Sequence, residues 1–158
     1  MRAMTAILGI GALAALVATV YVWTGSAADV RSGVMPESVD LVAGEALYAG
    51  TCAACHGANL EGQADWRSPG EDGRLPAPPH DETGHTWHHA DQLLFDYTKL
   101  GGREVMVAQG MEFDSGMLGF GDQLSDEEIW NILGYIKSTW PKEIQDMQAA
   151  RTYGVPVN

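Results

Sequence analysis

The two cysteines of the chain stand three positions apart and are followed at once by a histidine, in the run Cys52-Ala53-Ala54-Cys55-His56. This run can be the attachment site of a c-type haem, in which the two thiols bond to the porphyrin and the adjacent imidazole reaches the iron. A redox dithiol belongs in a βαβ context, which is missing here, and a thiolate-rich zinc site would need further cysteines. The motif therefore predicts one covalent haem c, bound through Cys52 and Cys55 with His56 as an iron ligand.

Four further histidines fall within ten residues: His80, His85, His88 and His89. Imidazole is a common ligand of copper and zinc, so a second metal site is one interpretation of this cluster. The other is a loop and helix start whose histidines form hydrogen bonds or face solvent. Adjacent residues on a helix point about 100° apart, so His88 and His89 cannot easily share a metal, whereas His85 could pair with either. We favour the second interpretation and keep the metal site as an alternative.

The elements that position these residues are predicted to be helices. One is expected over residues 40–51, with Gly44, Leu47, Tyr48 and Thr51 on one face. A second is expected over 87–100, capped by Thr86 and ended by Gly101-Gly102. Its predicted apolar face consists of Ala90, Leu93, Leu94 and Tyr97.

A third helix is predicted to begin at a capping box formed by Ser125 and Glu128 and to end near Trp140, because Pro141 follows. Its apolar stripe consists of Ile129, Ile132, Leu133 and Ile136. A further short helix is expected over 142–153. The stretches 57–86 and 101–124 are rich in glycine and are predicted as long loops, which is unusual in a compact domain unless a cofactor holds them. The body is thus predicted to be all-α, with three helices and two long loops.

Three segments carry a family resemblance. They are Gly44-x-x-x-Tyr48-x-x-x-Cys52-Ala53-Ala54-Cys55-His56-Gly57, then Met117-Leu118-Gly119-Phe120, then Leu124-Ser125-Asp126-Glu127-Glu128-Ile129 with Tyr135-Ile136-Lys137. In these segments the chain resembles the class I, monohaem c-type cytochromes, from residue 41 to about residue 138. The resemblance implies the class I cytochrome c fold, with three main helices and long loops around one haem. It also implies that Gly44 and Tyr48 face Ile132 and Tyr135 where the first and last helices cross, and that a proline carbonyl, of Pro78 or Pro79, accepts a hydrogen bond from His56.

Met117 is the predicted second iron ligand, because its place before the last helix is similar to that of the axial methionine in this family. Met111, in the same loop, is the second candidate, and Met106 and the histidines are the others. The family has a proline after this methionine, where the present chain has Leu118. Histidine and methionine together leave no open position on iron, which favours electron transfer over substrate turnover.

The start of the chain is predicted to be a single transmembrane helix. Residues 3–23 carry no charge, span roughly 31 Å as a helix, and end with Tyr21 and Trp23 at the place of an aromatic belt. Arg2 favours the cytoplasmic side for the amino terminus. A signal peptide cleaved after Ala28 is the alternative, and both interpretations export the body. The predicted divisions are an anchor or signal segment (1–24), a linker (25–39), a cytochrome c domain (40–140) and a helical tail (141–158).

Charge bears on the partners of the protein. Asp and Glu outnumber Lys and Arg by 21 to 9, which gives a net charge of −12 and argues against a nucleic-acid-binding protein, because such proteins carry basic surfaces. We expect redox donor and acceptor proteins with basic docking faces. The predicted function is electron transfer, in a protein tethered to the bacterial cytoplasmic membrane with its C-terminal domain in the periplasm. The alternatives are a haem protein with a second copper or zinc site at residues 80–89, or a haem enzyme or sensor with an open iron site.

Overall fold

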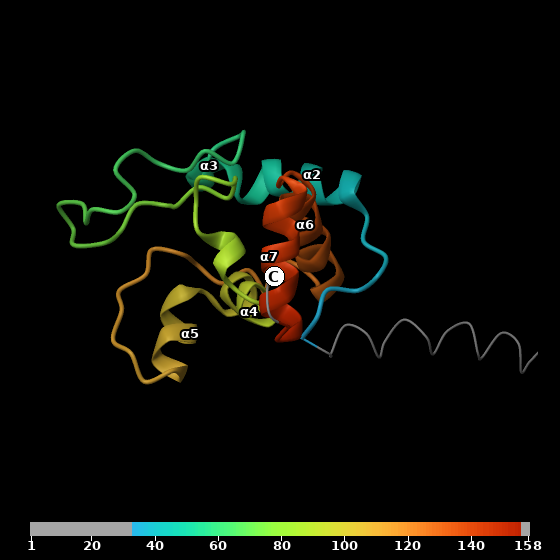
Figure 1. Ribbon diagram of the computed structural model, residues 1–158. Helices are drawn as coiled ribbons and strands as arrows, with labels where there is room; N and C mark the ends of the chain where they lie inside the picture. Colours follow the sequence, from blue (N-terminus) through green and yellow to red (C-terminus); the bar gives the residue numbers. More distant parts are fainter. Residues whose placement is uncertain (1–32, 156–158) are drawn as a thin grey trace, which may run out of the picture.

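The computed structural model describes residues 33–155, and all regular structure in this part of the chain is helical (Figure 1). The elements are α2 (Leu41–Thr51), α3 (Ala53–His56), the short 3-10 helix η2 (Thr86–His88), α4 (Asp91–Leu100), α5 (Gly102–Ala108), α6 (Asp126–Ser138) and α7 (Lys142–Tyr153). Among these residues no helix has both the length and the apolar character needed to cross a membrane. The predicted membrane-spanning run 3–23 and the alternative cleavage site after Ala28 lie outside the described residues.

The crossing of α2 over α6 is the most extensive contact between helices in the described region. Asp40 caps α2 by accepting from the amides of Val42 and Ala43, both at 3.0 Å, so the helix starts where the sequence predicts. A Cβ at Gly44 would overlap the backbone carbonyl of Asn131, which shows that glycine permits the close approach. The expected crossing is therefore present.

Helix α6 supplies the centre of the core. It begins at the predicted capping box, in which Ser125 and Glu128 each bind the backbone of the other. The four predicted apolar positions are all buried: Ile129, Ile132, Leu133 and Ile136. Trp130, also buried, adds a stacked contact with Phe95 of α4 at 4.5 Å between ring centroids.

The prediction of one helix over 87–100 was wrong about the first turn. Residues Thr86–His88 form η2, the backbone of His89 and Ala90 is extended, and α4 begins only at Asp91. Thr86 cannot cap the helix because its hydroxyl lies 2.7 Å from the ring of His80 and donates to the carbonyl of Pro79. The buried face of α4 differs accordingly and consists of Asp91, Leu94, Phe95 and Thr98.

The second long loop is shorter than predicted because it contains α5. Gly101, with φ 91°, ends α4 as expected, but Gly102 then opens a new helix instead of continuing the loop. A Cβ at Gly102 would overlap the side chain of Ser115, so the second glycine is required by packing. The loop proper covers residues 109–125.

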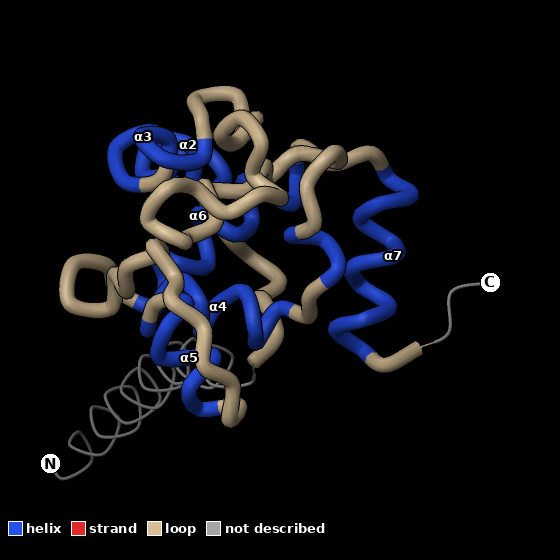
Figure 2. The backbone as a smooth tube through the Cα atoms, turned by 90° about the vertical axis from the view of Figure 1, so that its left-hand side faces the viewer, coloured by secondary structure: helices blue, strands red, loops and turns tan. Residues whose placement is uncertain are grey.

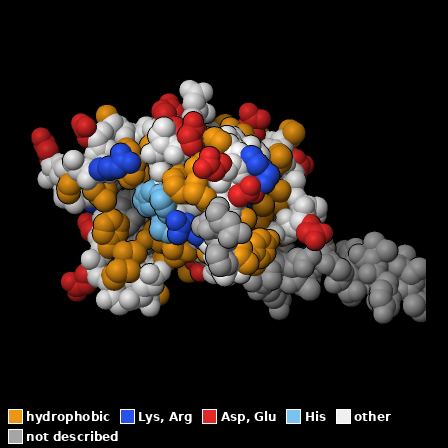
Figure 3. Space-filling view, in the orientation of Figure 1, with side chains coloured by type: hydrophobic (Ala, Val, Ile, Leu, Met, Phe, Trp, Pro, Cys, Tyr) orange, Lys and Arg blue, Asp and Glu red, His pale blue; other side chains and the backbone are white. Residues whose placement is uncertain are grey.

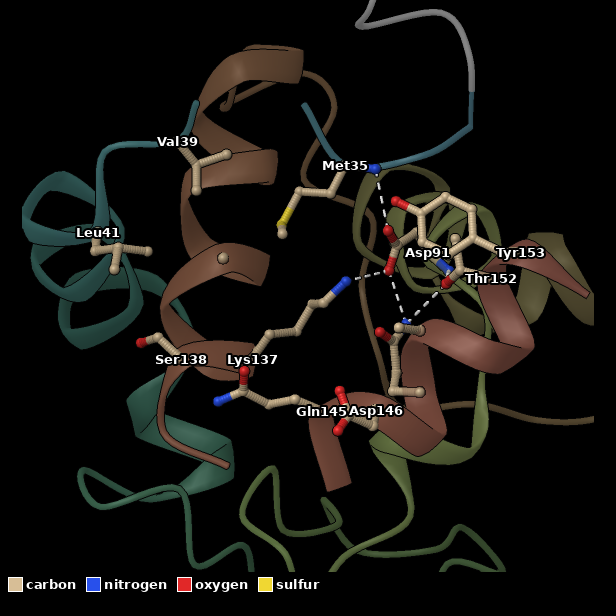
Figure 4. A pocket seen from close by; sticks show the side chains of 13 residues that line it. Met35, Val39, Leu41, Asp91, Lys137, Ser138, Gln145, Asp146, Thr152 and Tyr153 are labelled. Carbon is tan, nitrogen blue, oxygen red and sulfur yellow. Dashed lines mark hydrogen bonds and ion pairs between the residues drawn. The ribbon is translucent and has the colours of Figure 1, made fainter. Parts of the chain in front are cut away.

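Helix α7 has the bounds expected from the sequence and lies along one side of the molecule, away from α3 and α5 (Figure 2). It is fastened to α4 and α6 around Asp91, whose carboxylate binds Lys137 at 2.5 Å and Gln148 at 2.7 Å (Figure 4). The amide of Met35 also donates to this carboxylate, at 3.0 Å. A cavity of about 380 Å³ lies beside this cluster, and none of the predicted haem-binding residues lines it.

Candidate haem-binding site

The C-x-x-C-H motif forms one helical turn at the end of α2. The carbonyl of Cys52 accepts from the amides of Cys55 and His56, at 3.1 and 3.0 Å, and so closes the short helix α3. The thiols of Cys52 and Cys55 are both free, the first buried and the second exposed. Burial, followed by the neighbouring Cys55, raises the pKa of the Cys52 thiol to about 11.

The ring of His56 is buried and oriented by one hydrogen bond. Its Nδ1 lies 2.8 Å from the carbonyl oxygen of Pro78, so the structure selects Pro78 over Pro79 as the partner. Because a carbonyl can only accept, Nδ1 carries the proton and Nε2 keeps its lone pair for a metal. Burial lowers the pKa of His56, against the opposing effect of the Pro78 hydrogen bond, and this favours the neutral imidazole that binds iron.

The loop after the motif turns back at Gly62, where it packs against His56, Pro78 and Pro79. The amide of Gly62 donates to the carbonyl of His56 at 2.7 Å, and a Cβ at Gly62 would overlap the backbone of Pro78 and Pro79. Tyr48, which is buried in α2, donates its hydroxyl to the carbonyl of Gly57 at 2.9 Å. Burial is the main reason why the pKa of Tyr48 is raised. The hydroxyl therefore stays protonated and remains a donor. These contacts fix the turn that carries the cysteines and the histidine.

His80 lies against His56, a contact that the sequence did not predict. The two rings are stacked, with 4.0 Å between their centroids and 21° between their planes. Burial lowers the pKa of His80 well below its usual value, with the charges of His56 and His85 acting in the same direction. The sequence marks His80 as part of the histidine cluster but does not predict this contact, because the contact depends on the path of the loop from His56 to Pro78.

The other three histidines lie apart from His56 in aromatic contacts. His85 stacks on Trp66 at 5.6 Å, His88 on Trp87 at 3.6 Å, and His89 meets His85 edge-on at 5.1 Å between centroids. Histidine surface is visible between hydrophobic and basic side chains in Figure 3. Within residues 33–155 no group of three or more His, Cys, Asp or Glu side chains is arranged to hold a metal ion. The alternative of a copper or zinc site at residues 80–89 thus gains no support.

The backbone of Met117 is fixed by two hydrogen bonds to other residues. Its amide donates to the hydroxyl of Ser115 at 3.1 Å, and its carbonyl accepts from Gly102 at 3.1 Å. Met117 and Met106 are partly buried, whereas Met111 is 43% exposed. The loop of Met117 is therefore anchored to the junction between α4 and α5.

The loop that follows His56 and the loop of Met117 project on the same side of the molecule (Figure 1). They are joined by Arg74 and Asp114, whose side chains form two hydrogen bonds of 2.9 and 3.2 Å. Leu75 and Phe113, next to this pair in the chain, expose 41% and 38% of their surfaces. Apolar side chains are thus available where two loops meet.

The comparisons agree with this arrangement. Residues 41–140 match the family model for cytochrome c. This chain belongs to the cytochrome c family. It is also 37% identical over 97 residues to a thiosulfate dehydrogenase of Allochromatium vinosum. That alignment covers 61% of this chain and 30% of the relative, so the chain spans less than a third of that protein's length. No solved structure matched the chain.

Membership of the cytochrome c family confirms the resemblance to class I c-type cytochromes and implies a covalently bound haem c. The residues present fit this group. The two free thiols lie on one helical turn, and the buried imidazole of His56 keeps one nitrogen for iron. The family therefore supports haem-based electron transfer as the general function.

Proposed function

We propose that this cytochrome c carries electrons through one covalently bound haem c, with Cys52 and Cys55 as attachment residues and His56 and Met117 as axial ligands. The haem, when bound, supplies one-electron chemistry at its iron. The observation that carries the proposal is the single turn that presents both thiols together with His56, whose Nδ1 is bound to the Pro78 carbonyl 2.8 Å away. The chain's residues attach the cofactor, orient the imidazole and limit access to the metal.

Met117 supports the proposal that the protein is an electron carrier and not an enzyme by itself. With haem bound, the thioether of Met117 would be the second protein ligand of the iron and would stabilise its ferrous state. Met117 fits this role better than Met111, because its backbone is fixed on both sides and it is less exposed. The thiosulfate dehydrogenase relative is an enzyme by name, and the aligned part is 30% of its length. We infer that the similarity reflects a shared haem-binding domain.

The location we propose is the periplasmic side of the bacterial cytoplasmic membrane, with a tether through residues 3–23. The uncharged run and its terminal Tyr21 and Trp23 support the tether. Export of the body suits the motif, because c-type haem is attached outside the cytoplasm in bacteria. Fractionation of cells that produce the full chain, with N-terminal sequencing of the product, tests this: a mature chain that starts near Asp29 shows a cleaved signal instead.

Haem attachment is tested on the full chain by denaturation and acid extraction. Wild type is expected to keep its haem, whereas a Cys52→Ala, Cys55→Ala double variant should release any that remains. Visible spectra of the oxidised and reduced protein, with and without carbon monoxide, then test the closed iron site. Covalent haem in the double variant would contradict the attachment residues. Ready binding of carbon monoxide by wild type would favour the enzyme or sensor alternative.

A further inference from the structure

The imidazole of His56 is constrained from two directions. Its edge is held by the carbonyl of Pro78, at 2.8 Å from Nδ1, and its face is covered by the ring of His80, with 4.0 Å between centroids and 21° between planes. A single hydrogen bond in the plane of a ring still allows the ring to tip about that bond. A second planar ring against the face removes this freedom.

His80 is itself fixed by three different parts of the fold. Its ring Nδ1 lies 2.7 Å from the hydroxyl of Thr86 in η2, and its carbonyl accepts from the indole of Trp140, after α6, at 2.7 Å. Its amide donates to the carbonyl of Leu60 at 2.7 Å. Thr86, Trp140 and Leu60 are all buried, so the anchors do not compete with solvent.

The hydrogen bonds also define how the ring of His80 is turned. Nδ1 of His80 and the hydroxyl of Thr86 are hydrogen-bonded at 2.7 Å, and the same hydroxyl lies 3.4 Å from the carbonyl oxygen of Pro79. This bond sets the direction of the imidazole plane, which an aliphatic side chain of similar volume at position 80 would lack. The His80 ring therefore meets His56 in a defined orientation, which packing of an aliphatic side chain would not provide.

We propose that His80 is a positioning residue that fixes the plane of the His56 imidazole about its bond to the haem iron. The proposal rests on the proposed function, since it assumes that His56 is an iron ligand. Residues beside a ligating histidine orient it and tune the metal without touching it. The orientation of an axial imidazole changes the energies of the iron d orbitals that share its π electrons. A rotated ring is therefore visible in the g values of the oxidised haem and in the NMR shifts of its methyl groups.

The test compares four variants of the haem-loaded full chain. His80→Leu removes the planar ring, and His80→Phe keeps a planar ring without its hydrogen bond. Thr86→Val keeps the His80 ring but removes the hydroxyl that binds it, together with the contact of that hydroxyl with the Pro79 carbonyl. His85→Leu is the matched control, because His85 is a histidine of the same segment that stacks on Trp66 instead of His56. Electron paramagnetic resonance and proton NMR of the oxidised protein supply the readouts, alongside the reduction potential.

We expect His80→Leu to keep its covalent haem and its low-spin spectrum, but with shifted g values, altered methyl shifts and a changed potential. His80→Phe should restore the wild-type values in large part, Thr86→Val should move them less than His80→Leu, and His85→Leu should leave them unchanged. Wild-type g values and methyl shifts in His80→Leu would overturn the role of His80 alone. If His80→Leu does not fold, wild-type g values and methyl shifts in Thr86→Val overturn it instead. A wild-type protein without low-spin haem would overturn the proposed function.

Discussion

Met117 is the residue on which the proposed chemistry depends most. Its amide and carbonyl are both bound, to Ser115 and Gly102, so the loop presents this residue in a defined way, whereas Met111 is 43% exposed. We predict that Met117→Ala abolishes the far-red sulfur-to-iron band of the oxidised protein and lowers the reduction potential by on the order of 0.1 V. The iron should then bind carbon monoxide or cyanide, and the haem should stay attached through Cys52 and Cys55.

Met111→Ala is the control for this prediction and should leave the band, the potential and ligand exclusion as in wild type. Visible spectroscopy and a redox titration measure all three. The assignment would be reversed if Met111→Ala removed the band and Met117→Ala kept it.

The site was predictable from the sequence only where neighbours along the chain define it. The spacing of Cys52, Cys55 and His56 sufficed, because one helical turn brings the three together. The resemblance to the cytochrome family left Pro78 and Pro79 as candidates for the hydrogen-bond acceptor of His56, and the structure was needed to select Pro78. The contact with His80, 24 positions further along the chain, arises from a loop path that no local pattern encodes.

The crossing of α2 and α6 positions the haem motif, and it depends on one glycine. A Cβ at Gly44 would overlap the backbone of Asn131, which cannot move as the end of a flexible side chain can. We predict that Gly44→Val destabilises the protein by about 1–3 kcal/mol, the usual cost of an overfilled core. Chemical denaturation followed by tryptophan fluorescence measures this.

Gly50 provides the matched control, because it lies in the same helix and a Cβ there would meet nothing within 4 Å. Gly50→Ala should be neutral or stabilising by up to about 1 kcal/mol, since alanine favours the helix over glycine. Equal losses of stability in the two variants would show that the close approach at position 44 is not the cause of the loss in Gly44→Val.

The attachment of α7 to the rest of the molecule is predicted to weaken in acid. Burial alone would raise the pKa of Asp91, but the hydrogen bond and charge of Lys137, with the Met35 amide and Gln148, outweigh it and lower the pKa. The native state therefore favours the carboxylate, and its stabilising contribution is complete above the unfolded-state pKa near 3.8. It is lost as the pH falls through the lower folded-state value.

Asp91→Asn tests this prediction. At neutral pH it should destabilise the protein by about 3 kcal/mol, since Lys137 loses its partner in a partly buried position. As the pH falls from the unfolded-state pKa of 3.8 toward the lower folded-state value, the stability of the variant should fall less steeply than that of wild type. The same slope in both proteins would contradict the role of Asp91.

Helix boundaries were predicted well where side chains cap the backbone and poorly where tertiary contacts compete. Asp40 and Ser125 start α2 and α6 because their oxygens bind the free amides of the first turn. Thr86 has the same chemistry, but its hydroxyl is used by His80 and Pro79, so η2 and the later start of α4 could not be foreseen. Gly102 is typical of a helix end and instead opens α5, because Ser115 packs closely against it.

The charge of the whole molecule bears on how it meets its partners. The net charge of −12 gives a long-range field that attracts cations and basic protein faces, and salt screens it over a Debye length of about 10 Å at 0.1 M. We predict that oxidation of the reduced protein by a cationic ruthenium ammine complex slows as ionic strength rises. Oxidation by ferricyanide, an anion, should become faster over the same range. Stopped-flow measurement at matched driving force gives both rates, and if neither responds to salt, the acidic surface serves solubility alone and does not steer redox partners.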